Sequence, residues 1–327
     1  MRRLALIGLF LAGTAACSYS SGNLAYQSTL FEPTRGVALR GASADPYRTD
    51  GMAQVGMNGT TCVVDVAWAG IGNDYDYPGV DEVVQANGNL DGQNVVVVTS
   101  DVGVHVQHGT DWDVTSDDYP VTGVQQASLA GGDVATLVDN GIKCQVDWVG
   151  ADSRQVLESG TCGVPYSLDA DPATGDAFVG SSHGVLRVSP GHSEVLTDKP
   201  SQLIAWDATS GVLYTATRGD SLLTAMAGDG SHLWSVDLGA SILDLDDMGT
   251  LGSAAVTLQH DDGTGGLMLV SGLDGTISES LDTPSAVPAI SGSPDGRSLA
   301  LVDADQVHFY KVSDPFGSMS TDGTTAP

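Results

Sequence analysis

Two short segments combine carboxylates with aromatic rings, and they hold the residues best suited to binding chemistry. The first is "NDYDYPGVDE", from Asn73 to Glu82, and the second is "DWDVTSDDYP", from Asp111 to Pro120. Rings can anchor a protein interface or stack on sugars, while carboxylates steer a partly basic partner toward them. The candidate partner-binding residues are Asp74, Tyr75, Asp76, Tyr77, Asp111, Trp112, Asp113 and Tyr119. We predict that both segments are loops on neighbouring blades, which can share one rim, although the sequence register does not establish that both point to the same face.

Two other interpretations of these segments stay open. They could be solvated acidic loops whose aromatic rings serve the structure alone. Their carboxylate oxygens could also bind calcium. The spacing of "DYDYPGVDE" does not fit the EF-hand loop, which needs ligands at alternating positions and a distal glutamate. The sequence therefore assigns no metal site to either segment.

Motifs for catalysis or tight metal binding are missing from the sequence. It contains no GxSxG, no HExxH and no GxxxxGK[ST] phosphate loop. "GSSHG", from Gly180 to Gly184, places a serine beside a histidine, but we predict a turn between two strands there. His105 and His108 are three positions apart, which puts them on opposite faces of a strand. No catalytic residue, metal ligand or cofactor is assigned.

The charge balance narrows the class of partner. The chain has 41 Asp and Glu against 12 Lys and Arg, a formal net charge of −29. Such a surface repels phosphate, so nucleic acid is excluded as an expected partner. We attribute the acidity to solubility. Because 41% of the residues are hydrophobic, the chain can bury a large core.

The N-terminus has the pattern of a secretion signal. Arg2 and Arg3 precede an apolar run from Leu4 to about Ala12, which is too short to span a membrane. "TAAC", ending at Cys17, resembles a bacterial lipoprotein cleavage site. This resemblance implies cleavage before Cys17, lipid on its sulfur and a membrane as partner. By resemblance to lipoprotein sorting in Gram-negative cells, Ser18 after the cysteine favours the outer membrane; we expect the protein to face the periplasm, and the cell surface is the open alternative. An ordinary signal peptide cut nearby is the alternative.

Three further cysteines remain after such cleavage: Cys62, Cys144 and Cys162. In an oxidising envelope we expect two of them to pair. Cys144 and Cys162 are separated by a plausible hairpin and turn, so we predict a disulfide between them. Cys62 lies in "TTCVVDVAW", which we interpret as a buried strand.

A repeated pattern of strands and turns covers most of the chain. Windows that begin at a turn glycine each contain three short apolar runs separated by polar turns, and a fourth run precedes the glycine. The starting glycines are Gly92, Gly132, Gly175, Gly211, Gly252 and Gly296, with a weaker copy at Gly59. Four antiparallel strands in roughly 40 to 45 residues are typical of a β-propeller blade. We therefore predict an all-β fold with a single β-propeller of seven four-stranded blades, and six blades as the alternative.

The last repeat ends after three strands, at Val312. We expect an N-terminal strand within "NLAYQSTLF" or "GVALRG" to complete that blade and close the ring, which removes exposed strand edges. The predicted organisation is a signal peptide over 1–16, a lipidated tether that can hold the closing strand over 17–50, the propeller over 51–314 and a flexible tail over 315–327.

Two stretches carry a family resemblance. "SPDGRSLALVDADQVHFYKV", from Ser293 to Val312, resembles blades of WD40-like and TolB-type propellers. "GVLYTATRGDSLLTAMAGDGSHLWSVDL", from Gly211 to Leu238, resembles the pyrroloquinoline-quinone-type repeat. The resemblance implies a lipoprotein scaffold, without enzyme activity, for an envelope protein or polysaccharide. The alternative is an enzyme with its active site at the central channel, of the quinone-dependent dehydrogenase, lactonase or lyase type. The chain's five Glu and three Lys favour the scaffold.

Overall fold

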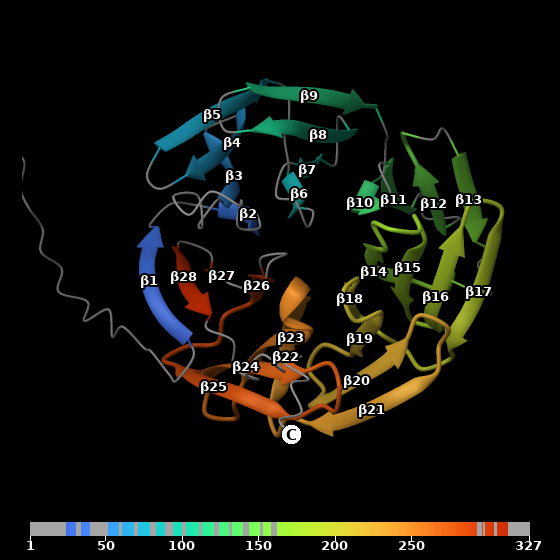
Figure 1. The fold of residues 1–327 in the computed structure, drawn as a ribbon, viewed down its shortest axis with the longest axis vertical. Coiled ribbons are helices and arrows are strands. Elements are labelled where there is room, and N and C mark those ends of the chain that lie inside the picture. Colours follow the sequence, from blue (N-terminus) through green and yellow to red (C-terminus); the bar gives the residue numbers. More distant parts are fainter. Residues whose placement is uncertain are drawn as a thin grey trace, which may run out of the picture.

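A computed structural model describes the strand segments between Leu24 and Pro120 and most of the chain from Val124 to Val312. The stretches left out of that second part are 131–132, 140–143, 151–152, 158–161, 293–295, 297 and 304–305. Within the described residues the strands form seven four-stranded antiparallel sheets, which are arranged as blades around a central axis (Figure 1). The prediction of an all-β propeller is confirmed.

The strands follow the chain in order, and each sheet is named by its strands. The first three complete sheets are β2 (Thr34–Leu39), β3 (Met52–Asn58), β4 (Thr61–Trp68) and β5 (Ile71–Pro78); β6 (Val83–Gly88), β7 (Asn94–Thr99), β8 (Gly103–Thr110) and β9 (Asp113–Tyr119); and β10 (Val124–Ala130), β11 (Asp133–Asp139), β12 (Cys144–Trp148) and β13 (Ser153–Leu157).

The remaining sheets complete the circle. They are β14 (Pro165–Ala170), β15 (Ala177–Ser181), β16 (Gly184–Ser189) and β17 (His192–Thr197); β18 (Leu203–Asp207), β19 (Val212–Ala216), β20 (Leu222–Ala227) and β21 (His232–Asp237); β22 (Ser241–Asp247), β23 (Ser253–Gln259), β24 (Gly265–Ser271) and β25 (Ile277–Thr283); and β26 (Ala289–Gly292), β27 (Ser298–Asp303) and β28 (Gln306–Val312) with β1 (Leu24–Leu30). A single turn of 3-10 helix, Gly249–Leu251, lies between β22 and β23.

The two ends of the described chain close one sheet together. β1 pairs with β28 in antiparallel register, and Leu24 lies opposite Val312. β1 falls within "NLAYQSTLF", one of the two segments in which we expected a closing strand. The other segment, "GVALRG", overlaps β2, the inner strand of the next sheet. Among the described residues, strands of the propeller therefore occur from Leu24 onward, well before residue 51.

The repeated glycine has a backbone cause. It lies in the turn between the first and second strands of a sheet, where Gly175 and Gly211 have φ of 78° and 68°. A side chain is disfavoured in this left-handed region, so glycine recurs at the turn. The prediction that Gly59 begins a repeat was wrong, because the second strand of sheet β2–β5 is β3, and Gly51 precedes it. Gly51 stands 41 residues before Gly92, in line with the other spacings.

Antiparallel order gives each sheet two distinct ends. The turns between first and second strands, such as Asp171–Gly175, share one end with the turns between third and fourth strands, such as Gly272–Thr276. We call this end the terminal face, because Leu24 and Val312 also lie on it. The connections between sheets share the opposite end with the turns between second and third strands. We call it the crossover face; there Gly219 N–H donates to Ile242 of the next sheet at 2.8 Å.

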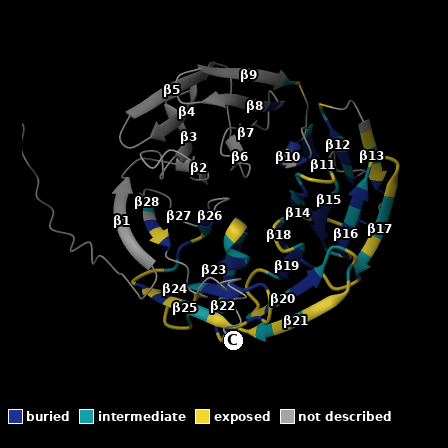
Figure 2. Ribbon diagram, in the orientation of Figure 1, coloured by how far each residue is buried: buried dark blue, intermediate teal, exposed yellow. Residues whose placement is uncertain are grey.

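The core consists of apolar layers between neighbouring sheets. One layer joins Leu137 and Trp148 of sheet β10–β13 to Leu168 and Leu186 of sheet β14–β17. Further layers fill the next boundaries along the described chain. Strands such as β18 and β19 are buried along their whole length for this reason, whereas no residue of the outermost strands β17 and β21 is buried (Figure 2). Each sheet thus depends on its neighbours for burial.

Cys144 and Cys162 form a disulfide, with 6.4 Å between their Cα atoms. Cys144 begins β12, and Cys162 lies in the connection that leads to β14. The bridge therefore ties the third strand of one sheet to the entrance of the next. Both cysteines are buried in the apolar layer between these sheets. Cys62 lies in β4, as the apolar pattern predicts.

Candidate functional site: carboxylates between the blades

The two acidic and aromatic segments are mainly strands, which corrects the prediction of loops. Asp74, Tyr75, Asp76 and Tyr77 lie in β5, and Asp113 and Tyr119 lie in β9. β5 and β9 are the outermost strands of consecutive sheets. Short polar residues and tyrosines alternate in these strands. Pairing of β5 with β4 and of β9 with β8 outweighs the tendency of Asp and Asn to form turns. Asp111, Trp112 and Cys17 lie outside the described residues.

Tyr119 is the one candidate whose surroundings are described. It is half-buried and packs against a cluster of five buried side chains, Val104, Val124, Ala127, Val134 and Val138. This position, at the boundary between sheets β6–β9 and β10–β13, gives its ring a packing role.

"GSSHG" forms the predicted turn. Ser182 and His183 lie between β15 and β16, on the crossover face. The Ser182 N–H donates to the main-chain oxygen of Val164 at 2.9 Å, and Ser182 Oγ accepts from the Val164 N–H at 2.9 Å. The serine therefore pins the connection between sheets, which explains why serine suits this turn.

Carboxylates on the inner strands connect neighbouring sheets, a feature that the sequence analysis missed. Asp169 Oδ2 accepts the N–H of Trp206 in the next sheet at 2.6 Å. In sheet β22–β25, Asp244 Oδ2 accepts the N–H of Ile290 at 3.1 Å, and Asp246 Oδ2 accepts the N–H of Gly292 at 2.8 Å. Each bond crosses from one inner strand to the next. These side chains hold adjacent blades together near the central axis.

Asp169 contacts three sheets at once. Its Oδ1 accepts Ser128 Oγ–H of sheet β10–β13 at 2.9 Å and its neighbour Ala170 N–H at 2.8 Å. Its Oδ2 binds Trp206 of sheet β18–β21. One carboxylate in β14 thus holds the sheets on both sides. Gln126 has a related role, since its Oε1 accepts Leu168 N–H.

Burial raises the pKa of these inner carboxyls. Each of these residues is partly exposed as a whole, but protein atoms surround its carboxyl group. Desolvation raises the pKa of Asp169 and that of Asp244 to about 6, against accepted hydrogen bonds that lower both. Desolvation, with Asp169 and Asp244 nearby, raises the pKa of Asp246 to about 8. The Asp247 pKa is also raised, by burial and by the charges of Asp246, Asp169 and Asp207.

A second group of aspartates builds turns. Each accepts a main-chain N–H from the residue two positions later, at 2.8 to 3.0 Å; the group is Asp171, Asp207, Asp229, Asp237, Asp262 and Asp274. Hydrogen bonds lower the pKa of the four exposed members, Asp229, Asp237, Asp262 and Asp274. Part of the acidity therefore has a structural purpose, because Asp is a favoured turn residue.

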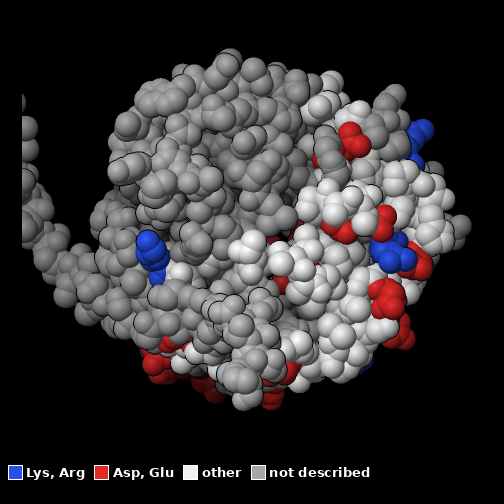
Figure 3. Space-filling view, viewed as in Figure 1, with Lys and Arg blue, Asp and Glu red and all other residues white. Residues whose placement is uncertain are grey.

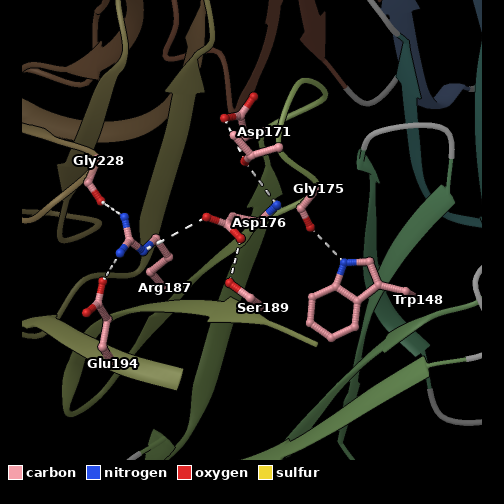
Figure 4. A network of polar contacts seen from close by, with 9 residues as sticks. Trp148, Asp171, Gly175, Asp176, Arg187, Ser189, Glu194 and Gly228 are labelled. Atoms are coloured by element: carbon pink, nitrogen blue, oxygen red, sulfur yellow. Dashed lines mark hydrogen bonds and ion pairs between the residues drawn. The ribbon is translucent and has the colours of Figure 1, made fainter. Parts of the chain in front are cut away.

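A chain of polar contacts links three sheets near the terminal face (Figure 4). The Trp148 indole N–H donates to the main-chain oxygen of Gly175 at 2.8 Å, in a turn of the next sheet. Ser189 Oγ–H donates to Asp176 Oδ1 at 2.5 Å. Arg187 forms an ion pair with Glu194 and approaches Asp176 to 4.0 Å. Its Nη1–H donates to the Gly228 oxygen of the third sheet at 3.1 Å. These contacts fix the blades at their outer parts.

In the described residues, the notable polar side chains are carboxylates that accept hydrogen bonds, and no cluster suited to catalysis stands out. The same part of the chain contains no group of three or more His, Cys, Asp or Glu side chains placed to hold a metal ion. Asp169, Asp244 and Asp246, whose pKa values are raised, accept hydrogen bonds from neighbouring sheets. On the face in Figure 3, acidic groups gather along the rim of the described part and basic groups are few. In the part of the chain that the structure describes, no helix has the length and apolarity to cross a membrane.

Comparisons with known proteins agree with this architecture. A scan against protein-family models finds no match, and a search of curated proteins finds no significant relative. Among solved structures, a chain of the mitotic checkpoint complex is similar, with a TM-score of 0.64 and 16% identity over 88% of this chain and 96% of that one. The β-propeller domain of Myceliophteria thermophila Cps50 (Swd1) has a TM-score of 0.63 and 11% identity, over 88% and 99%. At these identities the likeness concerns the fold alone, and it agrees with the β-propeller that the sheets form.

Proposed function

We propose that this protein is an envelope-anchored lipoprotein whose β-propeller is a non-enzymatic platform for an envelope protein or a polysaccharide. The anchor is lipid on Cys17, and the location is the outer membrane, on its periplasmic side. The observation that carries the proposal is the position of β1, which belongs to the ring and starts only seven residues after Cys17. Lipid at Cys17 would hold the propeller itself at the membrane.

The blade contacts support the role of a platform. Carboxylates, an indole and a guanidinium each bind main-chain groups of a neighbouring sheet. Such contacts limit the movement of blades against one another and present the outer surface as one rigid body. A preorganised surface binds a partner at a smaller entropic cost.

The partner surface that we propose includes β5 and β9. These outermost strands belong to consecutive sheets and carry Tyr75, Tyr77 and the aspartates around them, while Trp112 directly precedes β9. Tyrosine and tryptophan supply buried contact area, and carboxylates favour a partner with basic groups.

Two experiments test this proposal. Labelled palmitate should be incorporated into the parent and into a Cys62→Ala control but not into Cys17→Ala; incorporation into the Cys17 variant would refute the anchor. Affinity capture through a C-terminal tag, from detergent-solubilised membranes, should recover one envelope partner reproducibly. An empty capture would count against the platform. A chromophore retained after mixing with pyrroloquinoline quinone and calcium would instead favour the enzyme.

A further inference from the structure

The terminal face has an apolar edge beside the start of the chain. Leu273 is 77% exposed, the largest exposure of any large hydrophobic side chain in the described residues. It lies in the turn between β24 and β25, and Ile277, the first residue of β25, is 40% exposed. In the neighbouring sheet Leu233, at the start of β21, is 46% exposed. We call Leu233, Leu273 and Ile277 the apolar edge.

The apolar edge is held in place by ordered contacts. The Trp234 indole N–H donates to the main-chain oxygen of Gly272 at 2.8 Å. This bond fixes the residue after Leu233 to the residue before Leu273. Gly275 has a φ of 73° and packs closely under the Trp234 ring. The backbone on which Leu233 and Leu273 stand is therefore fixed, and both side chains remain exposed at this edge.

The start of the ring lies on the same face. Sheet β22–β25 packs against the sheet that contains β1, and Figure 1 places β25 next to β1. Leu24, opposite Val312, is at the terminal face. Residues 18–23 separate it from Cys17, so the two Cα atoms can be no more than about 25 Å apart at full extension. A lipid on Cys17 would keep the terminal face close to a bilayer.

We propose that the terminal face rests on the membrane and that the apolar edge enters the interfacial layer of the lipid. This inference depends on the proposed lipid anchor. Exposed apolar side chains gain by leaving water at a lipid surface, and a covalent acyl chain removes most of the cost of bringing them there. The crossover face then points away from the membrane, with exposed Val164 and Leu222.

Charge selects the kind of lipid surface. Asp274 follows Leu273, and Asp229 lies in the β20–β21 turn of the same face; both are exposed. Carboxylates at this rim repel anionic headgroups, and the described side chains of the β20–β21 and β24–β25 turns include no Lys or Arg. At the apolar edge the lipid surface that fits is therefore zwitterionic, and contact there depends on apolar insertion more than on charge; the exposed Lys311, one residue before Val312, is a basic group on another part of the same face.

Photo-crosslinking tests the orientation with the full lipidated chain in phosphatidylcholine vesicles. The photoreactive amino acid p-benzoyl-phenylalanine replaces Leu273 in one variant and Leu222 in a matched control, because Leu222 is 48% exposed on the crossover face. We expect the Leu273 variant to form lipid adducts at least several-fold more often than the Leu222 variant. Replacement of a third of the lipid by phosphatidylglycerol should lower the yield at Leu273.

The outcomes separate the two proposals. Acylated protein with equal adducts at both positions, or with none at Leu273, would overturn the orientation while leaving the anchor intact. Protein without palmitate and without adducts would overturn both. Adducts at Leu273 in protein that carries no palmitate would refute the anchor and support the apolar edge as a lipid contact of its own.

Discussion

The main-chain N–H of Trp206 donates a hydrogen bond of 2.6 Å to Asp169 Oδ2, across the boundary between sheets β14–β17 and β18–β21. The donor is a backbone group on an inner strand, and the acceptor is a side chain on the preceding inner strand. The Trp206 N–H is available for this bond because β18 is the innermost strand of its sheet and pairs with β19 on one side only. Removal of the acceptor leaves that N–H without a partner inside the ring.

Asp169→Asn should therefore destabilise the ring. The amide has one accepting oxygen where the carboxylate has two, so either Trp206 or the Ser128 and Ala170 pair loses its acceptor. An unsatisfied buried donor costs about 1–3 kcal/mol in unfolding free energy. Chemical denaturation followed by tryptophan fluorescence measures this loss.

The matched control for Asp169→Asn is Asp229→Asn. Asp229 is exposed and accepts the Ser231 N–H within its own turn. This variant should unfold close to the parent. Equal losses in both variants would mean that the contact between blades contributes no more than a turn does.

The disulfide should stabilise the fold by restricting the unfolded chain. Cys144 and Cys162 enclose a loop with a sequence separation of 18, which corresponds to about 3 kcal/mol on the chain-entropy estimate. Cys144→Ser together with Cys162→Ser should lower the unfolding free energy by up to that amount. Peptide mapping without reduction should find Cys144 joined to Cys162, and a bridge from Cys62 to either cysteine would contradict the assignment.

Gly184→Ala and Gly191→Ala should differ sharply, although both glycines have positive φ. A Cβ at Gly184 would lie 1.9 Å from the Thr197 main-chain oxygen, whereas a Cβ at Gly191 would meet nothing within 4 Å. Gly191→Ala should cost about 1–2 kcal/mol, from backbone conformation alone. Gly184→Ala should cost several kcal/mol more, or prevent folding, because β16 and β17 must separate. Similar unfolding midpoints would contradict the close contact.

The repeat could be found from sequence because its causes are local. Glycine with positive φ at Gly175 and Gly211 marks one turn of each blade, and β-branched runs mark the strands between turns. The same local logic failed at "NDYDYPGVDE". Its acidic and tyrosine-rich composition predicts a loop, but β5 pairs with β4 along its full length. Partner strands distant in sequence override local tendency.

The contacts between blades could not be predicted from the sequence. "LDLDD", from Leu243 to Asp247, resembles any acidic turn until β26 is placed beside β22. Only then do Asp244 and Asp246 meet the N–H groups of Ile290 and Gly292, 46 residues away. The signal available beforehand was the alternation of acidic and apolar residues in an otherwise apolar inner strand, which indicates a buried polar role.

Replacement of Tyr75, Tyr77 and Trp112 by Ala tests the proposed partner surface. β5 and β9 are outermost strands, so the fold should survive the change, and circular dichroism should match the parent. Capture of the envelope partner should fall at least tenfold, because aromatic anchors carry much of the binding energy of an interface. Higher salt should also weaken capture by the parent, since exposed carboxylates are screened. Undiminished capture by the triple variant would place the partner elsewhere on the ring.

The inner carboxylates should make the fold more stable in mild acid than at alkaline pH. The folded-state pKa of Asp246 is about 8 and those of Asp169 and Asp244 are about 6, all above the ordinary value of 3.8. A raised pKa means that the folded state binds more protons than the unfolded chain. The stability from these groups is therefore complete below pH 3.8 and is lost as pH rises through 6 and then 8. Turn aspartates such as Asp262 have a lowered pKa, so the stability that they contribute is lost only in acid, as the pH falls through their folded-state pKa.

Denaturation midpoints between pH 5 and 9 should accordingly fall as pH rises, and the fall above pH 6 should depend on the neighbouring carboxyls Asp246 and Asp247, which titrate together. In Asp246→Asn the side chain no longer titrates and the charge that helps to raise the pKa of Asp247 is removed, so the decline between pH 6 and 9 should become shallower, even though the lost acceptor lowers stability at every pH. Asp262→Asn, which alters an exposed turn carboxylate, should retain the slope of the parent. An infrared band from a protonated carboxyl at pH 7, present in the parent and weaker in Asp246→Asn, would identify the proton directly. A parent whose stability rises from pH 6 to 9 would show that the inner carboxylates are ionised in the folded ring and that their hydrogen bonds outweigh desolvation.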